Sequence, residues 1–266
     1  MNLNIPISAK KIIKFLLVII CILTSLSLLT EIISKFLDNR IFEFFSDIFN
    51  LGTERNIPTL FSVLILWLAS FLCALITFIK KEKGDRYTIH WGFLAVIFLL
   101  LGWDEGVQLH DALTNSALAT NLSSIAGIKK QGVFTFNWVV IAIPIVFLLG
   151  LSYLKFVWSF PIKQKKLLII AAITYVMGAL GMEMISALIF DTIGNKQLIY
   201  MFTSTSEDAL EMLGVVIFID FLLLHLGLYI DQITINFVKG DEPLPSAHLL
   251  PSSAHLIDEK MQNYVD

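Results

Sequence analysis

The chain alternates long apolar runs with short polar segments. Six runs approach or exceed the roughly 20 mostly apolar residues that a helix needs to cross a bilayer: residues 12–33, 58–79, 90–111, 136–157, 167–189 and 207–230. None shows the alternation of a barrel strand, and a helix satisfies its own backbone hydrogen bonds in lipid. The pattern predicts an all-α, polytopic membrane helix bundle of six transmembrane helices in residues 1–239, followed by a disordered tail in residues 240–266.

The composition agrees with a membrane protein. Hydrophobic residues make up 56% of the chain and charged residues 15%, whereas about 25% of a typical soluble domain is charged. Cys21 and Cys73 both fall inside apolar runs, so we interpret them as small core residues. The first run follows Lys10, Lys11 and Lys14 with no clear cleavage site, which favours a retained first span over a removed signal peptide.

Basic residues predict the orientation. Of the Lys and Arg residues, 13 fall on the side that holds both termini and six on the other. Because basic residues favour the cytoplasmic side, we expect both termini to be cytoplasmic, in a membrane of the bacterial inner-membrane type. On the outer side, residues 40–49 have an amphipathic pattern that suits an interfacial segment, and residues 112–135 are small and polar.

Carboxylates interrupt or flank four of the apolar runs at a similar predicted depth, near the outer ends of the helices. An ionisable group inside a membrane is costly and usually faces the bundle interior, where it marks a functional site. His110 and Asp111 follow the acids of the third run. We therefore predict one site near the outer face, with its metal ligands drawn from Glu54, Asp104, Glu105, His110, Asp111, Glu183, Glu207, Asp208 and Glu211.

Each of these signals has a structural alternative. Ser206 could cap the sixth helix, with Glu207 and Asp208 in its first turn. Glu183 could be a protonated acid that bonds a neighbouring helix. Asp104, Gln108 and Asp111 have helical spacing and would share one face, whereas His110 would point elsewhere unless the helix ends there.

Other polar residues in the apolar runs have simpler interpretations. Asp220 and His225 lie deep in the sixth run, where interhelical hydrogen bonds are expected. Trp103 and Trp138 suit interfacial anchors.

The predicted ligand set narrows the chemistry. Carboxylate oxygens and one imidazole suit a divalent metal such as Fe, Mn, Zn or Ca. No Glu-x-x-His spacing occurs, so the likeness to di-iron bundles is weak. A metal that acts as a Lewis acid on a lipid or lipid-linked substrate is equally open. The sequence has no phosphate-binding glycine loop, no serine-nucleophile elbow and no signal for nucleic acid.

Several of these residues form recognisable motifs. They are Glu54-x-Asn56-x-Pro58-Thr59-x-x-Ser62, then Asp104-Glu105-x4-His110-Asp111, then Glu207-Asp208-x2-Glu211-x2-Gly214. In these motifs the chain resembles a group of bacterial polytopic membrane proteins of unknown function. The resemblance covers spans two to six, and it implies that the acids act as one site.

Two rival functions remain open at this stage. A cation or proton carrier would need polar groups that continue inward from the acids, and Asp220 with His225 is the one hint of such a path. A non-catalytic accessory subunit would use the acids to bind Ca²⁺ for rigidity.

Overall fold

The described part of the chain forms a bundle of helices, six of them long and apolar enough to cross a membrane. The structure is a computed structural model that describes residues 2–4, 8–37, 40–114, 116–195, 198–229 and 234–236. Five of these membrane-length helices are single elements: α1 (Ala9–Phe36), α3 (Ile57–Glu82), α4 (Thr88–Val107), α7 (Val139–Trp158) and α10 (Leu198–Leu226). The remaining one is made of three consecutive elements: α8 (Ile162–Val176), the π-helical turn η2 (Met177–Met182) and α9 (Glu183–Ile193). The predicted fold class is confirmed.

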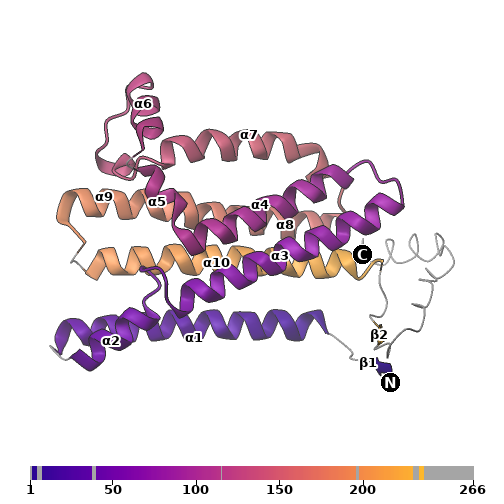
Figure 1. Cartoon of the computed structure of the whole chain (residues 1–266), viewed down its shortest axis with the longest axis horizontal. Coiled ribbons are helices and arrows are strands. Elements are labelled where there is room, and N and C mark those ends of the chain that lie inside the picture. The colour runs from indigo at the N-terminus through magenta and orange to yellow at the C-terminus, as the bar shows by residue number, and fades with distance from the viewer. Residues whose placement is uncertain are drawn as a thin grey trace, which may run out of the picture.

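Shorter elements gather at the two ends of the bundle (Figure 1). At one end lie α2 (Arg40–Phe49), α5 (Leu109–Thr114), α6 (Ala117–Ile125) and the 3-10 turn η1 (Gly132–Phe134). At the other end, β1 (Asn2–Asn4) pairs antiparallel with β2 (Thr234–Asn236). The two ends of the helical domain thus lie on the same side, as an even number of crossings requires.

These short elements bear on three predictions. The amphipathic stretch 40–49 is a helix, as its pattern indicated. The assignment of the end with β1 and β2 to the cytoplasm remains a prediction, and the tail 240–266 lies outside the described residues.

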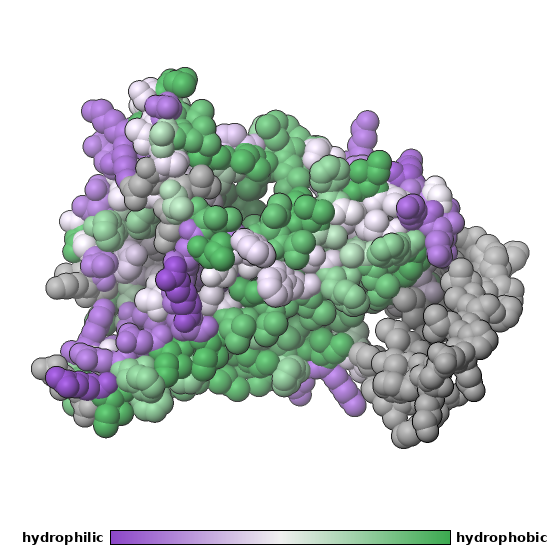
Figure 2. Space-filling model, in the orientation of Figure 1, coloured by the Kyte–Doolittle hydropathy of each residue, from purple (hydrophilic) through white to green (hydrophobic). Residues whose placement is uncertain are grey.

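The central helix is α10, which packs against α1, α3, α8 and η2. Its Ile219, Phe221 and Leu222 are fully buried. By contrast, large apolar side chains such as Phe71, Phe78 and Phe147 are more than 60% exposed. Figure 2 shows the result, an apolar surface along the helices with hydrophilic side chains toward both ends. Apolar side chains on the outside suit contact with lipid.

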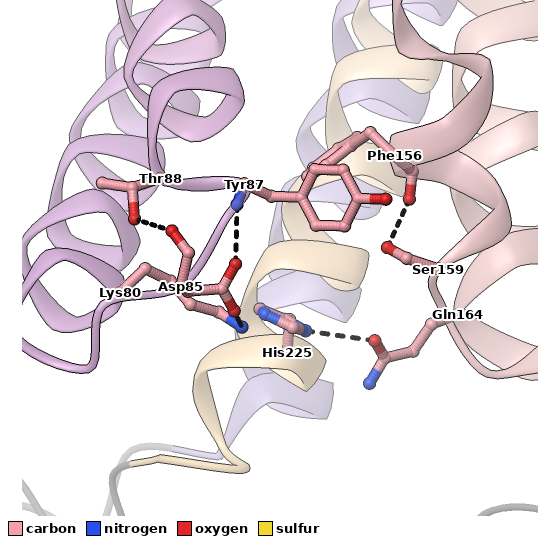
Figure 3. A network of polar contacts seen from close by, with 8 residues as sticks. All are labelled: Lys80, Asp85, Tyr87, Thr88, Phe156, Ser159, Gln164 and His225. Carbon is pink, nitrogen blue, oxygen red and sulfur yellow. Dashed lines mark hydrogen bonds and ion pairs between the residues drawn. The ribbon is translucent and has the colours of Figure 1, made fainter.

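Polar and aromatic contacts close the end of the bundle near the termini (Figure 3). Lys80 Nζ lies 2.6 Å from Asp85 Oδ2, and the Tyr87 hydroxyl donates to the Lys155 carbonyl at 3.1 Å. Burial would raise the pKa of Asp85, but hydrogen bonds from Lys80 and from the Tyr87 backbone N–H outweigh it and lower this pKa. These contacts join α3, α4 and α7 at this end.

Deep in the same end, His225 Nδ1 lies 3.1 Å from Gln164 Oε1 of α8. Its ring also packs near those of Trp91 and Phe160. The prediction that His225 makes an interhelical hydrogen bond is confirmed.

Two glycines allow α10 to approach α8 and η2 closely. A Cβ built on Gly214 would lie 2.6 Å from the Tyr175 backbone nitrogen. One built on Gly178 would lie 2.9 Å from both the Glu211 backbone nitrogen and the Glu207 carbonyl oxygen. Small residues let helix backbones pack this tightly in membranes. The contact falls at the level of the acids, so it sets the distance between the helices that carry them.

This contact predicts that Gly214→Ala destabilises the bundle. The added methyl meets backbone atoms that cannot rotate away, and overpacking of this kind typically costs about 1–3 kcal/mol. Thermal unfolding in detergent should show a lower midpoint than wild type. Gly150→Ala is the matched control, because a Cβ there meets no atom within 4 Å. An equal response of the two variants would contradict the close contact.

Candidate functional site

A cavity of about 850 Å³ opens among α3, α4, α7, α8, η2, α9 and α10. Eight of the nine predicted site residues line it: Glu54, Asp104, Glu105, His110, Glu183, Glu207, Asp208 and Glu211. The ninth, Asp111, belongs to α5, and its side chain lies outside the described part of the chain. The structure therefore brings the predicted acids together, although they come from four separate segments of the sequence.

Glu54 lies in the turn that leads into α3, and Asn56 holds this turn in place. The Asn56 side chain accepts a hydrogen bond from the Thr59 backbone N–H at 3.1 Å and so caps the helix. Its amide donates to the Asn50 carbonyl at 2.6 Å and to the Thr53 carbonyl at 2.8 Å. One side chain thus ties the start of the helix to the turn that carries Glu54.

His110 joins two of the acids because α4 ends before it. The helix stops at Val107, and Gln108 takes a left-handed conformation with φ of 62°. The His110 backbone N–H donates to Asp104 Oδ1 at 2.9 Å, and its ring Nδ1 lies 3.1 Å from Asp104 Oδ2. Its Nε2 lies 3.5 Å from Glu54 Oε1. The imidazole therefore bridges Asp104 and Glu54.

The same break corrects one prediction. A continuous helix through residues 90–111 would place Asp104, Gln108 and Asp111 on one face, but the helix ends at Val107, so that shared face does not exist. A residue with positive φ cannot continue a right-handed helix. We expected His110 to point away from the acids unless the helix ended before it. The helix does end before it, at Val107.

Glu183 and Glu207 meet across the interface of α9 and α10. Trp138 Nε1 donates to Glu183 Oε1 at 3.0 Å, and Ser186 Oγ donates to Glu207 Oε2 at 3.2 Å. The two carboxyl groups also interact with each other. Glu183 comes directly after the π-helical turn η2. Such turns change the helical register and are frequent at functional sites.

The sixth helix begins earlier than its hydropathy indicated. It starts at Leu198, not at residue 207, so Ser206, Glu207 and Asp208 lie more than two turns inside it. Ser206 Oγ donates to the Phe202 carbonyl at 2.6 Å within the helix. The interpretation of Ser206 as a helix cap is wrong, and a favourable helix dipole cannot account for Glu207 and Asp208.

The cavity also contains residues that were not among the predicted metal ligands. Trp138, expected as an interfacial anchor, instead lines the cavity, and its ring centre lies 5.4 Å from that of His110. Tyr175 and Ser62 line it too, where Tyr175 interacts with Glu211 and Ser62 with Glu105. Ser62 stands in the first recognised motif, which was a usable signal. The sequence contained no signal for Tyr175 beyond the presence of a polar group in an apolar run.

The charge balance of the cavity is unusual for membrane depth. Seven carboxyl groups line it, all half-buried, and His110 is the basic side chain among the described lining residues. Asp220 and His225 do not line it. Within the described ranges, no group of three or more Asp, Glu, His or Cys side chains is already arranged to hold a metal ion. Any cation bound here would require these side chains to turn toward it.

The chain was compared with known proteins. A family described as "Domain of unknown function (DUF8692)" has a model that matches residues 13–226. The chain belongs to this family. Residues 13–226 run from the first turns of α1 to the end of α10, so DUF8692 includes every residue that lines the cavity. Neither a curated protein nor a solved structure matches the chain.

The geometry around Asp104 predicts the effect of removing it. Asp104→Ala leaves the His110 backbone N–H without its acceptor, and a hydrogen bond of this kind contributes about 0.5–1.5 kcal/mol. Hydrogen exchange, read by mass spectrometry, should therefore speed up in residues 108–114 by up to about tenfold. Asp47→Ala, at an exposed acid of α2, should leave that segment unchanged. Unaltered exchange in Asp104→Ala would show that this carboxylate does not hold the turn.

Proposed function

We propose that the protein is a multi-pass membrane protein whose acidic cavity binds a divalent cation and acts with it on a membrane-embedded lipid or lipid-linked substrate. In this proposal the protein lies in a cell membrane of the bacterial inner-membrane type. Its cavity lies near the outer face of this membrane, and both termini lie in the cytoplasm. The observation that carries the proposal is the meeting of seven carboxyl groups and one imidazole in one cavity.

Electrostatics favours a bound cation. Two carboxylates about 5 Å apart repel each other by about 3 kcal/mol at the effective dielectric constant of about 20 that suits protein sites. Glu207 interacts in this way with Glu183, Asp208 and Glu211, and His110 can offset one charge at most. The cluster must therefore hold protons or bind cations. Tight packing against Gly178 and Gly214 keeps the acid-bearing helices together despite this repulsion.

The contacts divide the acids into two groups. Asp104 and Glu54 both contact His110, so we assign these two acids to positioning the imidazole. Glu105, Glu183, Glu207, Asp208 and Glu211 converge from α4, α9 and α10, and we assign the cation to this second group. Carboxylate oxygens suit Mn, Fe, Zn or Ca. A metal bound here would supply a Lewis acid, while Tyr175 and Trp138 offer hydrogen-bond donors beside it.

The rival functions differ in what they require of this cavity. A carrier needs polar groups that continue from the acids toward the other end of the bundle. Asp220 and His225, the candidates for that path, stand away from the cavity, and His225 is bonded to Gln164 among aromatic rings. No observation of the described residues favours the carrier. An accessory subunit rigidified by Ca²⁺ would share the cation site but turn over no lipid.

The proposal predicts metal in the purified protein. After exposure to low concentrations of Mn, Fe, Zn and Ca, followed by removal of free ions, elemental analysis should find a stoichiometric divalent metal. The double variant Glu207→Gln, Glu211→Gln should lose it, because each amide keeps the shape of the carboxyl group but cannot carry its charge. The identity of the metal would then direct assays toward redox or hydrolytic chemistry.

The control removes the same charge elsewhere. Glu43 and Asp47 are exposed acids of α2, so the double variant Glu43→Gln, Asp47→Asn should keep the metal content of wild type. Thermal unfolding of each variant shows whether it is folded. Absence of metal from folded wild type, or equal metal in the cavity variant, would refute the cation site.

A further inference from the structure

The cavity has an apolar shaft beneath its acidic end. Its lining includes Leu94 and Leu101 of α4, Ala142 and Ile145 of α7, Ala172 of α8 and Phe218 of α10. The described lining residues below Glu105 and Glu211 are thus almost all apolar. Such a shaft offers no hydrogen bonds to water or to a polar ligand, and it suits a hydrocarbon chain.

The shaft is also long. From Glu105 to Leu94 on α4 is eleven residues, which corresponds to about 16 Å at 1.5 Å per residue. A volume of about 850 Å³ lies near the upper end of the range for small-molecule pockets, about 300–1,000 Å³. The cavity is therefore larger than a bound ion and its ligands require.

The shaft opens sideways, between α4 and α7. Ile145 lines the cavity and is 59% exposed. Figure 2 shows a hollow on this face, between α7 and the helices below it. Neighbouring Leu148, 63% exposed, belongs to the apolar outer surface, so the opening faces the zone that lipid chains would occupy.

Contacts at both ends frame this opening. Toward the termini, the Tyr153 hydroxyl donates to the His90 carbonyl at 2.9 Å and joins α7 to α4. Toward the acids, Trp138 contacts Glu183 and His110. Between them lies Pro144, which has no N–H for the helical hydrogen bond at its position. The middle of α7 thus lacks one helical hydrogen bond beside the opening.

Charge complementarity indicates which polar head group the ligand carries. Whatever lies in the shaft places its polar end against the carboxyl groups, and His110 is the basic group among the described lining residues. The seven carboxyl groups outnumber the charges that His110 and one divalent cation can offset together, so an anionic head would meet charge of its own sign, whereas an ammonium would meet hydrogen-bonding partners of opposite charge.

We infer that the cavity takes from the bilayer an amphiphile whose hydrocarbon chain fills the shaft between α4, α7 and α8 and whose amine head faces the carboxyl groups. The chain enters between α4 and α7, past Ile145. This inference rests on the part of the proposed function that gives the acidic cavity a membrane-embedded substrate, and not on the bound cation, and it adds the substrate class.

Native mass spectrometry of the detergent-purified, chelator-treated full-length protein tests the inference. The probes are three amphiphiles of one chain length, with amine, hydroxyl or carboxylate heads. The amine should bind about tenfold more tightly than the carboxylate, a ratio that one favourable contact of about 1.4 kcal/mol explains. The double variant Glu207→Gln, Glu211→Gln should reduce this preference.

The shaft itself is tested by filling it. Ala142→Phe should abolish binding of the amine by occupying the shaft, and Ala172→Phe should do the same from the facing helix. Leu148→Phe adds an aromatic ring at a lipid-facing position of α7 and should leave binding as in wild type. Thermal unfolding identifies any variant that does not fold, and the two filling variants serve as replacements for each other.

The outcomes separate this inference from the cation site. Equal binding of the three heads, no binding to wild type, or full binding in both folded filling variants would overturn it. Metal content in Ala142→Phe should equal that of wild type, since the shaft lies below the acids. Amine binding in a protein that never holds metal would sustain the inference and refute the proposed function, and metal without amine binding would do the reverse.

Discussion

The backbone contact of α10 with α8 and η2 is the constraint on which the cavity depends. Gly178 and Gly214 let these helices approach to a distance that a Cβ would forbid. The contact lies beside Tyr175, Glu207 and Glu211, so it fixes the wall from which the acids project. Membrane helices gain little from excluding lipid, and close backbone packing of this kind is a main source of their association. The repelling acids therefore sit beside one of the closest helix contacts in the bundle.

From this contact outward, the bundle has two unlike ends. The end near β1 and β2 is closed by aromatic stacking around Trp91 and His225 and by the Lys80–Asp85 pair. The other end is opened by helix breaks at Gln108 and around η2, which turn polar groups inward. Irregular backbone at membrane depth is tolerated where it lines a cavity. The architecture combines a rigid base with a polar chamber above it, and this is the arrangement that a binding site needs.

Hydropathy was enough to predict six spans, because each helix that meets lipid must be apolar over its length. It misplaced the end of α4, which stops before the left-handed Gln108, and the start of α10, since polar residues such as Ser204 and Glu207 continue a helix when they face a cavity. The basic residues and helix lengths predicted that the acids share a similar depth, but not that they meet in space, because the order of the helices in the bundle does not follow from the sequence. The bridge from His110 to Asp104 was not, because it depends on the left-handed conformation of Gln108. Nor could the sequence reveal Trp138 as a partner of Glu183, since an interfacial tryptophan has the same pattern.

The proposed function depends on a divalent cation bound among the clustered carboxyl groups at membrane depth. Difference infrared spectroscopy of the protein in lipid bilayers, with and without added divalent cation, tests it most directly. The cation should shift intensity from protonated carboxyl bands to carboxylate bands, a chelator should reverse the shift, and the double variant Glu207→Gln, Glu211→Gln should reduce it sharply. An unchanged spectrum of folded wild type on addition of each candidate cation would show that these carboxyl groups bind none of them.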